Sequence, residues 1–166
     1  MNKILNLAIH HSAVSRFVQK EQFNPINNYH KSIFGMKSSL GIWVGYNALI
    51  EPSGKLIVCR ADGEETAAIV GHNKDTLHIC LAGNFDIDVP TQAQINKLRS
   101  WLAEKMRKFG LSADTIYNHR DLQINRTCPG CLIPRGWGQM LMQPLPAQPD
   151  DQKKAIDLMN FVKKSG

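Results

Sequence analysis

The chain has 166 residues, enough for one domain with a substantial hydrophobic core and too few for two domains of ordinary size. Its composition, 43% hydrophobic and 20% charged, is typical of a globular protein and excludes a disordered chain. A formal net charge of +6 favours an anionic partner, and nucleic acid, a membrane surface and an acidic cell-wall polymer all fit that description.

The chain starts with an apolar run, residues 4–9, that leads directly into His10 and His11. The run predicts a buried strand. It is much shorter than the roughly 20 apolar residues that cross a bilayer, and no small-residue cleavage site follows it. We therefore expect no signal peptide, no membrane insertion, and synthesis in the cytoplasm. In that reducing compartment we expect free thiols or metal ligands at the four cysteines: Cys59, Cys80, Cys128 and Cys131.

The next segments indicate a helix and a hairpin. Residues 25–34 predict a helix with Asn24 as its N-cap and Gly35 at its end. Its apolar residues fall on one side: Ile26, Tyr29, Ile33 and Phe34. Residues 41–50 and 55–60 are rich in branched and aromatic side chains and flank the turn sequence EPSG, which predicts two paired strands.

The second half of the chain continues the alternation of strands and helices. Residues 76–85 predict a buried strand, and residues 91–109 a helix whose first turn carries a capping box formed by Thr91 and Gln94. Residues 115–119 predict one more short strand. This order indicates an α/β fold: a single three-layer domain with a central mixed β-sheet flanked by helices on both faces.

The tail of the chain differs in composition from the rest. We place the folded domain at residues 1–141 and a proline-rich linker at residues 142–151. Residues 152–166 predict a short amphipathic helix, which is too small to be a separate domain.

Two of the predicted strands finish on a histidine, His10 and His119, and Cys128 follows nine positions after the second. In α/β sheets, functional groups collect at the carboxyl ends of the strands. Neutral imidazole and thiolate suit Zn²⁺, and three protein ligands leave a fourth position for water, as in catalytic zinc sites. These residues are therefore a candidate zinc set.

The sequence CPGC leaves two alternatives open. Cys128 and Cys131 are spaced as in a redox-active pair or as two ligands of a closed structural zinc site. No helical pattern follows Cys128, which counts against redox chemistry. Spacing alone does not exclude Cys131 as a fourth zinc ligand.

Taken together, four stretches give the chain a family resemblance. It resembles the zinc-dependent N-acetylmuramoyl-L-alanine amidases, the type-2 amidase family that includes phage endolysins and peptidoglycan recognition proteins. The similarity follows the family's order of motifs over residues 4–131. The matching stretches are AIHHSA, YHKSIFG with VGYNALIEPSGKLIVCR, NKDTLHICLAGNF, and NHRDLQINRTCPG.

The resemblance implies that His10, His119 and Cys128 hold one Zn²⁺ ion. Side chains alternate across a strand, so His10 and His11 should point to opposite faces and only one of them can face the metal. We expect His11 to pack or hydrogen-bond beneath the site and to orient its neighbours.

The resemblance also implies two catalytic residues. The family's catalytic tyrosine lies in a strand, at the position of Tyr46, and its second assisting residue, usually lysine or threonine, corresponds to Arg126. A neutral phenol can donate a hydrogen bond to an oxyanion, and a guanidinium can stabilise one although its shape differs from an ammonium. Asn47 stands where the family commonly has a histidine, and nothing obvious in the sequence replaces that histidine.

Further positions follow from the same comparison. His30 and Asn84 are predicted to border the substrate groove. Some family members carry a glutamate on the strand that matches residues 76–83, but Cys80 and Ala82 occupy those places here, so no carboxylate general base is predicted.

Four other polar residues are expected to have no part in the site. Glu64 and Glu65 are expected to be solvated loop charges, His72 is assigned to a loop, and His78 to the sheet.

The predicted function is hydrolysis of the amide bond between N-acetylmuramic acid and L-alanine in bacterial peptidoglycan. We expect an endolysin-like monomer that acts on the cell wall after release from the cytoplasm. Lysine and arginine are spread rather than clustered, so no nucleic-acid partner is predicted.

Three alternatives remain at this stage. The first is a cytoplasmic recycling amidase that acts on soluble anhydro-muropeptides. The second is a non-catalytic peptidoglycan-binding protein, against which Cys128 argues because such members typically lack the cysteine ligand. The third is a structural-zinc protein that binds nucleic acid through charge.

Overall fold

A five-stranded sheet runs through the computed structural model, which describes residues 2–143. The strands are β1 (Asn6–His11), β2 (Ala48–Ile50), β3 (Leu56–Val58), β4 (Thr76–Leu81) and β5 (Ile116–Asn118). Their order across the sheet is β3-β2-β4-β1-β5. β1 pairs in parallel with both β4 and β5, β2 pairs in parallel with β4, and the edge strand β3 is antiparallel to β2. The sheet is therefore mixed, as predicted.

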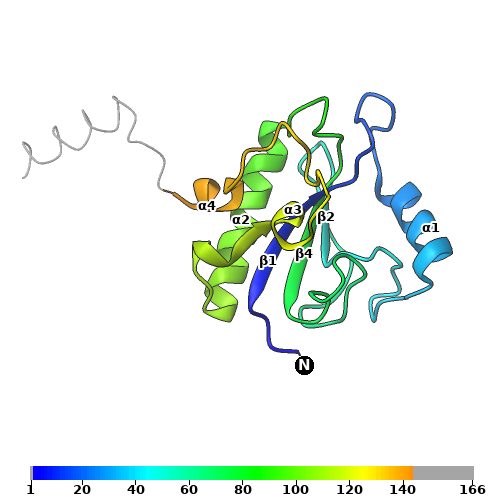
Figure 1. Cartoon of the computed structure of the whole chain (residues 1–166). Helices are drawn as coiled ribbons and strands as arrows, with labels where there is room; N and C mark the ends of the chain where they lie inside the picture. The colour runs from blue at the N-terminus through cyan, green and yellow to red at the C-terminus, as the bar shows by residue number, and fades with distance from the viewer. Residues whose placement is uncertain (1, 144–166) are drawn as a thin grey trace, which may run out of the picture.

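Two helices cover one face of the sheet (Figure 1). The longer is α2 (Gln92–Phe109), in which Thr91 and Gln94 form the predicted capping box and Gly110 ends the helix in a left-handed conformation. The shorter is α4 (Trp137–Met142), which the sequence did not predict. Apolar side chains from both helices pack against alternate residues of the central strands: Leu7, Ile9, Leu77, Ile79, Leu98, Leu102, Trp137 and Leu141.

The helix α1 (Phe23–Phe34) lies on the other side of the sheet in Figure 1. A smaller apolar cluster fills this layer, where Phe23 and Ile26 pack on Leu49, Cys80 and neighbouring residues. Helices therefore flank both faces, and the predicted three-layer α/β fold is confirmed. Two short elements complete the described chain, a 3-10 turn at Ala113–Thr115 and α3 (His119–Leu122).

The start of α1 differs from the prediction. The helix begins two residues earlier than expected, with Gln22 rather than Asn24 at the N-cap, and the side chain of Gln22 does not cap it. The carboxylate of Glu51, in the turn after β2, instead accepts hydrogen bonds from the backbone N–H groups of Gln22 and Phe23. A residue 28 positions away in sequence therefore satisfies the first N–H groups of the helix.

The outward face of α1 is also more apolar than expected. Tyr29, Ile33 and Phe34, predicted to share a packed face with Ile26, are 62%, 48% and 45% exposed. The buried residue of this helix is His30. Its Nδ1 atom accepts a hydrogen bond from the backbone N–H of Gly45.

The predicted linker (142–151) and C-terminal helix (152–166) lie outside the described residues, apart from residues 142 and 143. Within the described part, no helix is both long enough and apolar enough to cross a membrane.

The contact between Glu51 and α1 predicts a specific loss of stability. Glu51→Ala removes the acceptor for two backbone N–H groups at a position that is 3% exposed, so we expect the free energy of unfolding to fall by about 1–2 kcal/mol. Urea denaturation measures this change. Glu21→Ala is the matched control, because Glu21 is exposed and lies next to the same helix start. Equal stability of the two variants would show that Glu51 does not cap α1.

Candidate metal centre

The pairing of β1 with β5 brings two histidines together. Ile9 is the partner of Asn118 in the register of these strands, so the next residues, His10 and His119, are neighbours. Cys128 comes from the loop after α3. One ligand atom from each of these three side chains lies within 4.8 Å of the other two. The structure thus brings together the three residues that the sequence proposed as metal ligands.

Hydrogen bonds determine which ring nitrogens face the cluster. The Nδ1 atom of His10 lies 3.8 Å from the Sγ atom of Cys128, whereas its Nε2 atom lies 2.9 Å from Nδ1 of His78. The Nε2 atom of His119 lies 2.8 Å from Oε1 of Gln123, an acceptor, so it carries the proton and leaves Nδ1 as the electron-pair donor.

The prediction that His119 ends a strand is wrong, because His119 is the first residue of α3. β5 stops at Asn118, whose backbone N–H donates to the carboxylate of Asp121 at 2.9 Å. An acidic residue three positions into the helix favours helix initiation at this point. The sequence NHRD therefore starts a helix at the candidate ligand His119.

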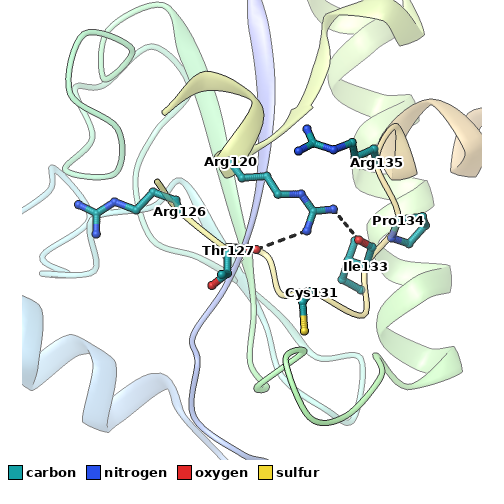
Figure 2. A pocket seen from close by; sticks show the side chains of 7 residues that line it. All are labelled: Arg120, Arg126, Thr127, Cys131, Ile133, Pro134 and Arg135. Carbon is teal, nitrogen blue, oxygen red and sulfur yellow. Dashed lines mark hydrogen bonds between the residues drawn. The ribbon is translucent and has the colours of Figure 1, made fainter. Parts of the chain in front are cut away.

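Arg120 holds the loop that carries Cys128 (Figure 2). Its guanidinium donates to the carbonyl oxygens of Gly130, at 2.8 Å, and of Ile133, and its backbone N–H donates to the carbonyl of Cys128 at 2.9 Å. Because Arg120 directly follows His119, these bonds fix the position of Cys128 relative to His119.

His11 lies on the opposite face of β1 from His10. Its Nδ1 atom accepts a hydrogen bond from the backbone N–H of Phe85 at 3.1 Å, and the two rings are 5.8 Å apart. Its own backbone N–H donates to the Sγ atom of Cys128 at 3.5 Å. His11 therefore supports the site from beneath, and its ring is not part of the cluster.

Tyr46 lies beside the cluster, with its ring 5.0 Å from that of His10. The prediction that it lies in a strand over residues 41–50 is wrong, because β2 begins only at Ala48. Side chains satisfy two backbone N–H groups just before Tyr46. The N–H of Trp43 donates to Asn27 at 2.7 Å, and the N–H of Gly45 donates to Nδ1 of His30 at 2.9 Å.

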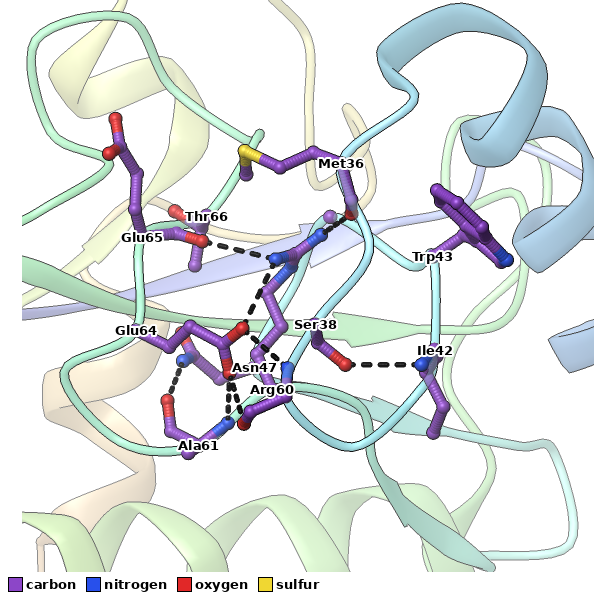
Figure 3. Close-up of polar contacts among 12 residues, drawn as sticks. Met36, Ser38, Ile42, Trp43, Asn47, Arg60, Ala61, Glu64, Glu65 and Thr66 are labelled. Atoms are coloured by element: carbon purple, nitrogen blue, oxygen red, sulfur yellow. Dashed lines mark hydrogen bonds and ion pairs between the residues drawn. The ribbon is translucent and has the colours of Figure 1, made fainter.

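The side chain of Arg60 also holds the segment before Tyr46 in place (Figure 3). This arginine is 1% exposed, and its guanidinium donates to the carbonyl oxygens of Val44, at 2.9 Å, of Glu65, at 3.2 Å, and of Met36. Three stretches of loop are thereby tied to one buried side chain. The chain around Tyr46 is held rigidly although it has no regular secondary structure.

Glu64 belongs to this network, so its expected role as a solvated charge is wrong. Its carboxylate accepts from the backbone N–H of Ser39 at 2.8 Å and of Ala61 at 3.0 Å, and it lies 3.8 Å from the guanidinium of Arg60. These hydrogen bonds hold the pKa of Glu64 below its usual value, although its partial burial acts in the opposite direction. Glu65, half exposed, lies 3.7 Å from Lys74.

Burial shapes the electrostatics of the site. It lowers the pKa of His10 well below the ordinary value, and the neighbouring histidines lower it further. Burial also lowers the pKa of His119 and raises that of Cys128 to about 12. The pKa of Tyr46 lies well above its ordinary value, because of burial and of the nearby Cys80 and Cys128 thiols. The imidazoles and the phenol are therefore neutral near pH 7.

A cavity of about 450 Å³ opens beside the cluster. His119, Gln123 and Arg126 line one part of it, and apolar or small side chains line the rest: Phe34, Ala67, Ala68, Ile69 and Val70, with Asn73. Arg126 is exposed, and its charge contributes to the lowered pKa of His119. The predicted second catalytic residue therefore lies at the same cavity as a candidate ligand.

The two predicted groove residues have structural contacts of their own. His30 is 7% exposed, and its ring lies 5.5 Å from that of Tyr46. Asn84 is partly buried, and its side-chain oxygen accepts from the backbone N–H of Asp86 at 3.1 Å. Their contact with a substrate stays a prediction.

Cys131 is separate from the three-residue cluster. It is exposed, its backbone N–H donates to the carboxylate of Asp86 at 2.8 Å, and it lines a different cavity of about 370 Å³ (Figure 2). All four cysteines are free in this structure.

The donor set fits zinc. A tetrahedral zinc ion bound at about 2.0 Å from nitrogen and about 2.3 Å from sulfur sets those donors about 3.5 Å apart. The separation between Nδ1 of His10 and Sγ of Cys128, 3.8 Å, is close to that value. Two neutral imidazoles and one cysteine, which would release its proton on binding the ion, also match the ligand chemistry of zinc.

The sequence did not assign His78, Gln123 or Arg120 to the site. Gln123 is four residues after His119, a spacing that predicts contact only if a helix is already known there. His78 could have been found from the alternation of β4, since Leu77 and Ile79 belong to the α2 face and residue 78 must face the other way.

Comparison with known proteins gives a family match and a shared fold. The family model described as N-acetylmuramoyl-L-alanine amidase matches residues 1–131. The amidase LysC from Clostridium intestinale is similar in structure, with a TM-score of 0.65 and 21% identity over 78% of each chain. No curated protein sequence matches the chain significantly.

Peptidoglycan recognition proteins have the same fold. Drosophila PGRP-SD has a TM-score of 0.67 and 19% identity, and the match covers 88% of this chain and 83% of that one. PGRP-LE, solved in complex with tracheal cytotoxin, a monomeric diaminopimelic acid-type peptidoglycan, has a TM-score of 0.64 and 21% identity over 78% of this chain and 76% of that one.

The burial of His30 predicts a pH dependence of stability. Burial lowers its pKa from 6.5 to about 4, with a contribution from Arg60, so the unfolded state binds the proton first as the pH falls. The stabilisation is complete above pH 6.5 and is lost progressively towards pH 4. Between pH 7.5 and pH 5 the native protein should lose about 2 kcal/mol more than His30→Asn, which keeps an acceptor for Gly45 but does not titrate. Urea denaturation of both proteins at the two pH values tests this, and parallel losses would contradict it.

Proposed function

The chain belongs to the N-acetylmuramoyl-L-alanine amidase family, and we propose that it is a zinc-dependent enzyme that cleaves the amide bond between N-acetylmuramic acid and L-alanine in bacterial peptidoglycan. The observation that carries the proposal is the cluster of His10, His119 and Cys128, with donor atoms within 4.8 Å of one another beside an open cavity. Three ligands of this kind leave one coordination position open, which suits catalysis rather than a purely structural role.

The proposed reaction overcomes two chemical difficulties. An amide carbonyl is a poor electrophile, and water is a poor nucleophile at neutral pH. A zinc ion held by His10, His119 and Cys128 would supply Lewis acidity to the carbonyl and would lower the pKa of bound water. The protein must then place the substrate amide at the cluster and stabilise the negative charge that develops on the carbonyl oxygen.

Tyr46 and Arg126 are the residues proposed for that stabilisation. The phenol of Tyr46 keeps its proton because its pKa is raised, so it can only act as a neutral hydrogen-bond donor to the oxyanion near pH 7. Arg126 adds a permanent positive charge from the cavity wall that also contains His119. His30 and the Arg60 network keep Tyr46 in place through the backbone of Gly45 and Val44.

The cavity and the net charge support peptidoglycan as the substrate. Apolar walls at Phe34 and residues 67–70 suit sugar rings and short aliphatic side chains, and the charge of +6 favours approach to an anionic cell wall. A protein of the same fold, PGRP-LE, has been solved with a monomeric peptidoglycan fragment. We propose that the protein acts as a monomer on the wall of a lysing cell, in the manner of an endolysin, without a nucleic-acid partner.

The proposal predicts defined products from a simple digestion. Purified protein should release new L-alanine amino termini from peptidoglycan, detected by mass spectrometry, and no new reducing sugar ends. A chelator should abolish the release, and added Zn²⁺ should restore it. Cys128→Ser should lose at least about 100-fold in rate because it removes one ligand, whereas Cys131→Ser should retain activity. Reducing ends without new amino termini would contradict the proposal.

The choice of substrate separates the wall-lytic enzyme from its alternatives. Intact sacculi should be cleaved at least as readily as soluble anhydro-muropeptides. A marked preference for the soluble fragments would indicate a recycling amidase instead. Binding to sacculi without any cleavage, in protein shown to contain zinc, would indicate a recognition protein.

The role proposed for Tyr46 predicts a loss of rate without loss of metal. Tyr46→Phe keeps the ring that packs on His10 but removes the hydroxyl, so kcat should fall about 100- to 1,000-fold. Zinc content and the melting temperature should stay near those of the native protein. The matched control is Tyr29→Phe, since Tyr29 is an exposed tyrosine of α1. Unchanged kcat in Tyr46→Phe would remove the phenol from the mechanism.

A further inference from the structure

A chain of three polar groups extends from the candidate metal centre into the protein. The Nε2 atom of His10 lies 2.9 Å from Nδ1 of His78, and the Nε2 atom of His78 lies 3.1 Å from the backbone carbonyl oxygen of His72. His10 and His78 are 1% and 0% exposed. Neither ring therefore exchanges these partners for water.

The direction of each hydrogen bond follows from the last group in the chain. A carbonyl oxygen only accepts, so Nε2 of His78 must carry a proton. A neutral ring has one N–H, so Nδ1 of His78 is then an acceptor, and Nε2 of His10 must be the donor. Nδ1 of His10 is left with its lone pair, and this is the atom that faces Cys128 at 3.8 Å.

The backbone of His78 is held in place by Asn47. The N–H of His78 donates to the side-chain oxygen of Asn47 at 2.8 Å, and the N–H of Asn47 donates to the carbonyl of His78 at 2.9 Å. Asn47 also donates from its side-chain nitrogen to the carbonyl of Ala61 at 3.2 Å. Asn47, which stands where the resembling family commonly has a histidine, thus holds the backbone of His78, the residue that contacts His10.

We propose that His78 is a positioning residue that fixes His10 in the tautomer whose Nδ1 lone pair points at Cys128 and His119. The inference rests on the proposed zinc site, and it deepens that site by assigning the coordinating atom of His10 and the group that selects it. Outer hydrogen-bond partners of this kind orient a ligand and raise its basicity, and their loss typically weakens metal binding 10- to 100-fold.

The first test uses the native protein and needs no substitution. Long-range ¹H–¹⁵N NMR of the histidine rings in metal-free protein at pH 7.5 should show both His10 and His78 as Nε2–H tautomers. After addition of one equivalent of Zn²⁺, the Nδ1 resonance of His10 should shift while Nε2 keeps its proton. An Nδ1–H tautomer of His10, or zinc bound through its Nε2 atom, would overturn the inference.

The second test measures zinc affinity by competition with a chromogenic chelator. His78→Leu fills a similar volume without an acceptor and should bind Zn²⁺ 10- to 100-fold more weakly than native protein. His78→Asn places a side-chain oxygen near the position of Nδ1 and should recover most of that loss. His72→Ala is the matched control, because the group that His78 contacts there is a backbone carbonyl, which the variant keeps.

The outcomes separate this inference from the proposed function. Native protein that binds no zinc would refute the zinc site, while the tautomers of the metal-free protein would still be measured. If the native protein binds zinc and both His78→Leu and His78→Asn bind it as tightly as the native protein does, the role of His78 is refuted and the zinc site is not. If His78→Leu does not fold, His78→Asn and the NMR experiment still decide the question.

Discussion

The parallel pairing of β1 with β5 is the constraint on which the site depends. These strands are more than 100 residues apart in sequence, and their register places His10 beside His119. Side chains alternate across a strand, so a slip of one residue in β1 would present His11 to the cluster and turn His10 towards the α2 layer. The apolar residues Leu7 and Ile9 prevent such a slip because they are fully buried on the α2 face.

Loops supply the remaining groups, and buried polar side chains give those loops a fixed shape. Arg60 holds the segment before Tyr46, and Arg120 holds the segment around Cys128, each through several backbone carbonyls. A buried carbonyl without a partner costs free energy, so each arginine makes one loop conformation much more stable than the alternatives. The site is thus rigid where regular secondary structure is absent, and rigidity of this kind is needed to keep three candidate metal ligands in place.

The sequence predicted the parts of the fold that depend on local pattern. The helix over 91–109, the hairpin turn and the central strands follow from periodicity and capping, and the candidate ligands His10, His119 and Cys128 followed from strand ends and a family resemblance. The prediction of a strand over all of residues 41–50 was wrong. The composition of this segment favours a strand, but the side chains of Asn27, His30 and Arg60 form hydrogen bonds with its backbone instead. Contacts between distant segments carry no local signal.

The two adjacent histidines show how far one strand can serve a site. His10 offers its ring to the cluster, and His11 offers its backbone N–H to Cys128 while its ring accepts from Phe85 on the other face. On the neighbouring strand β4, the Nδ1 atom of His78 contacts the Nε2 atom of His10, on the side of the ring away from Cys128. The central strands therefore supply a candidate ligand, the backbone N–H that donates to the sulfur of Cys128, and the side chain proposed to orient His10, and all three depend on strand pairing rather than on loop geometry.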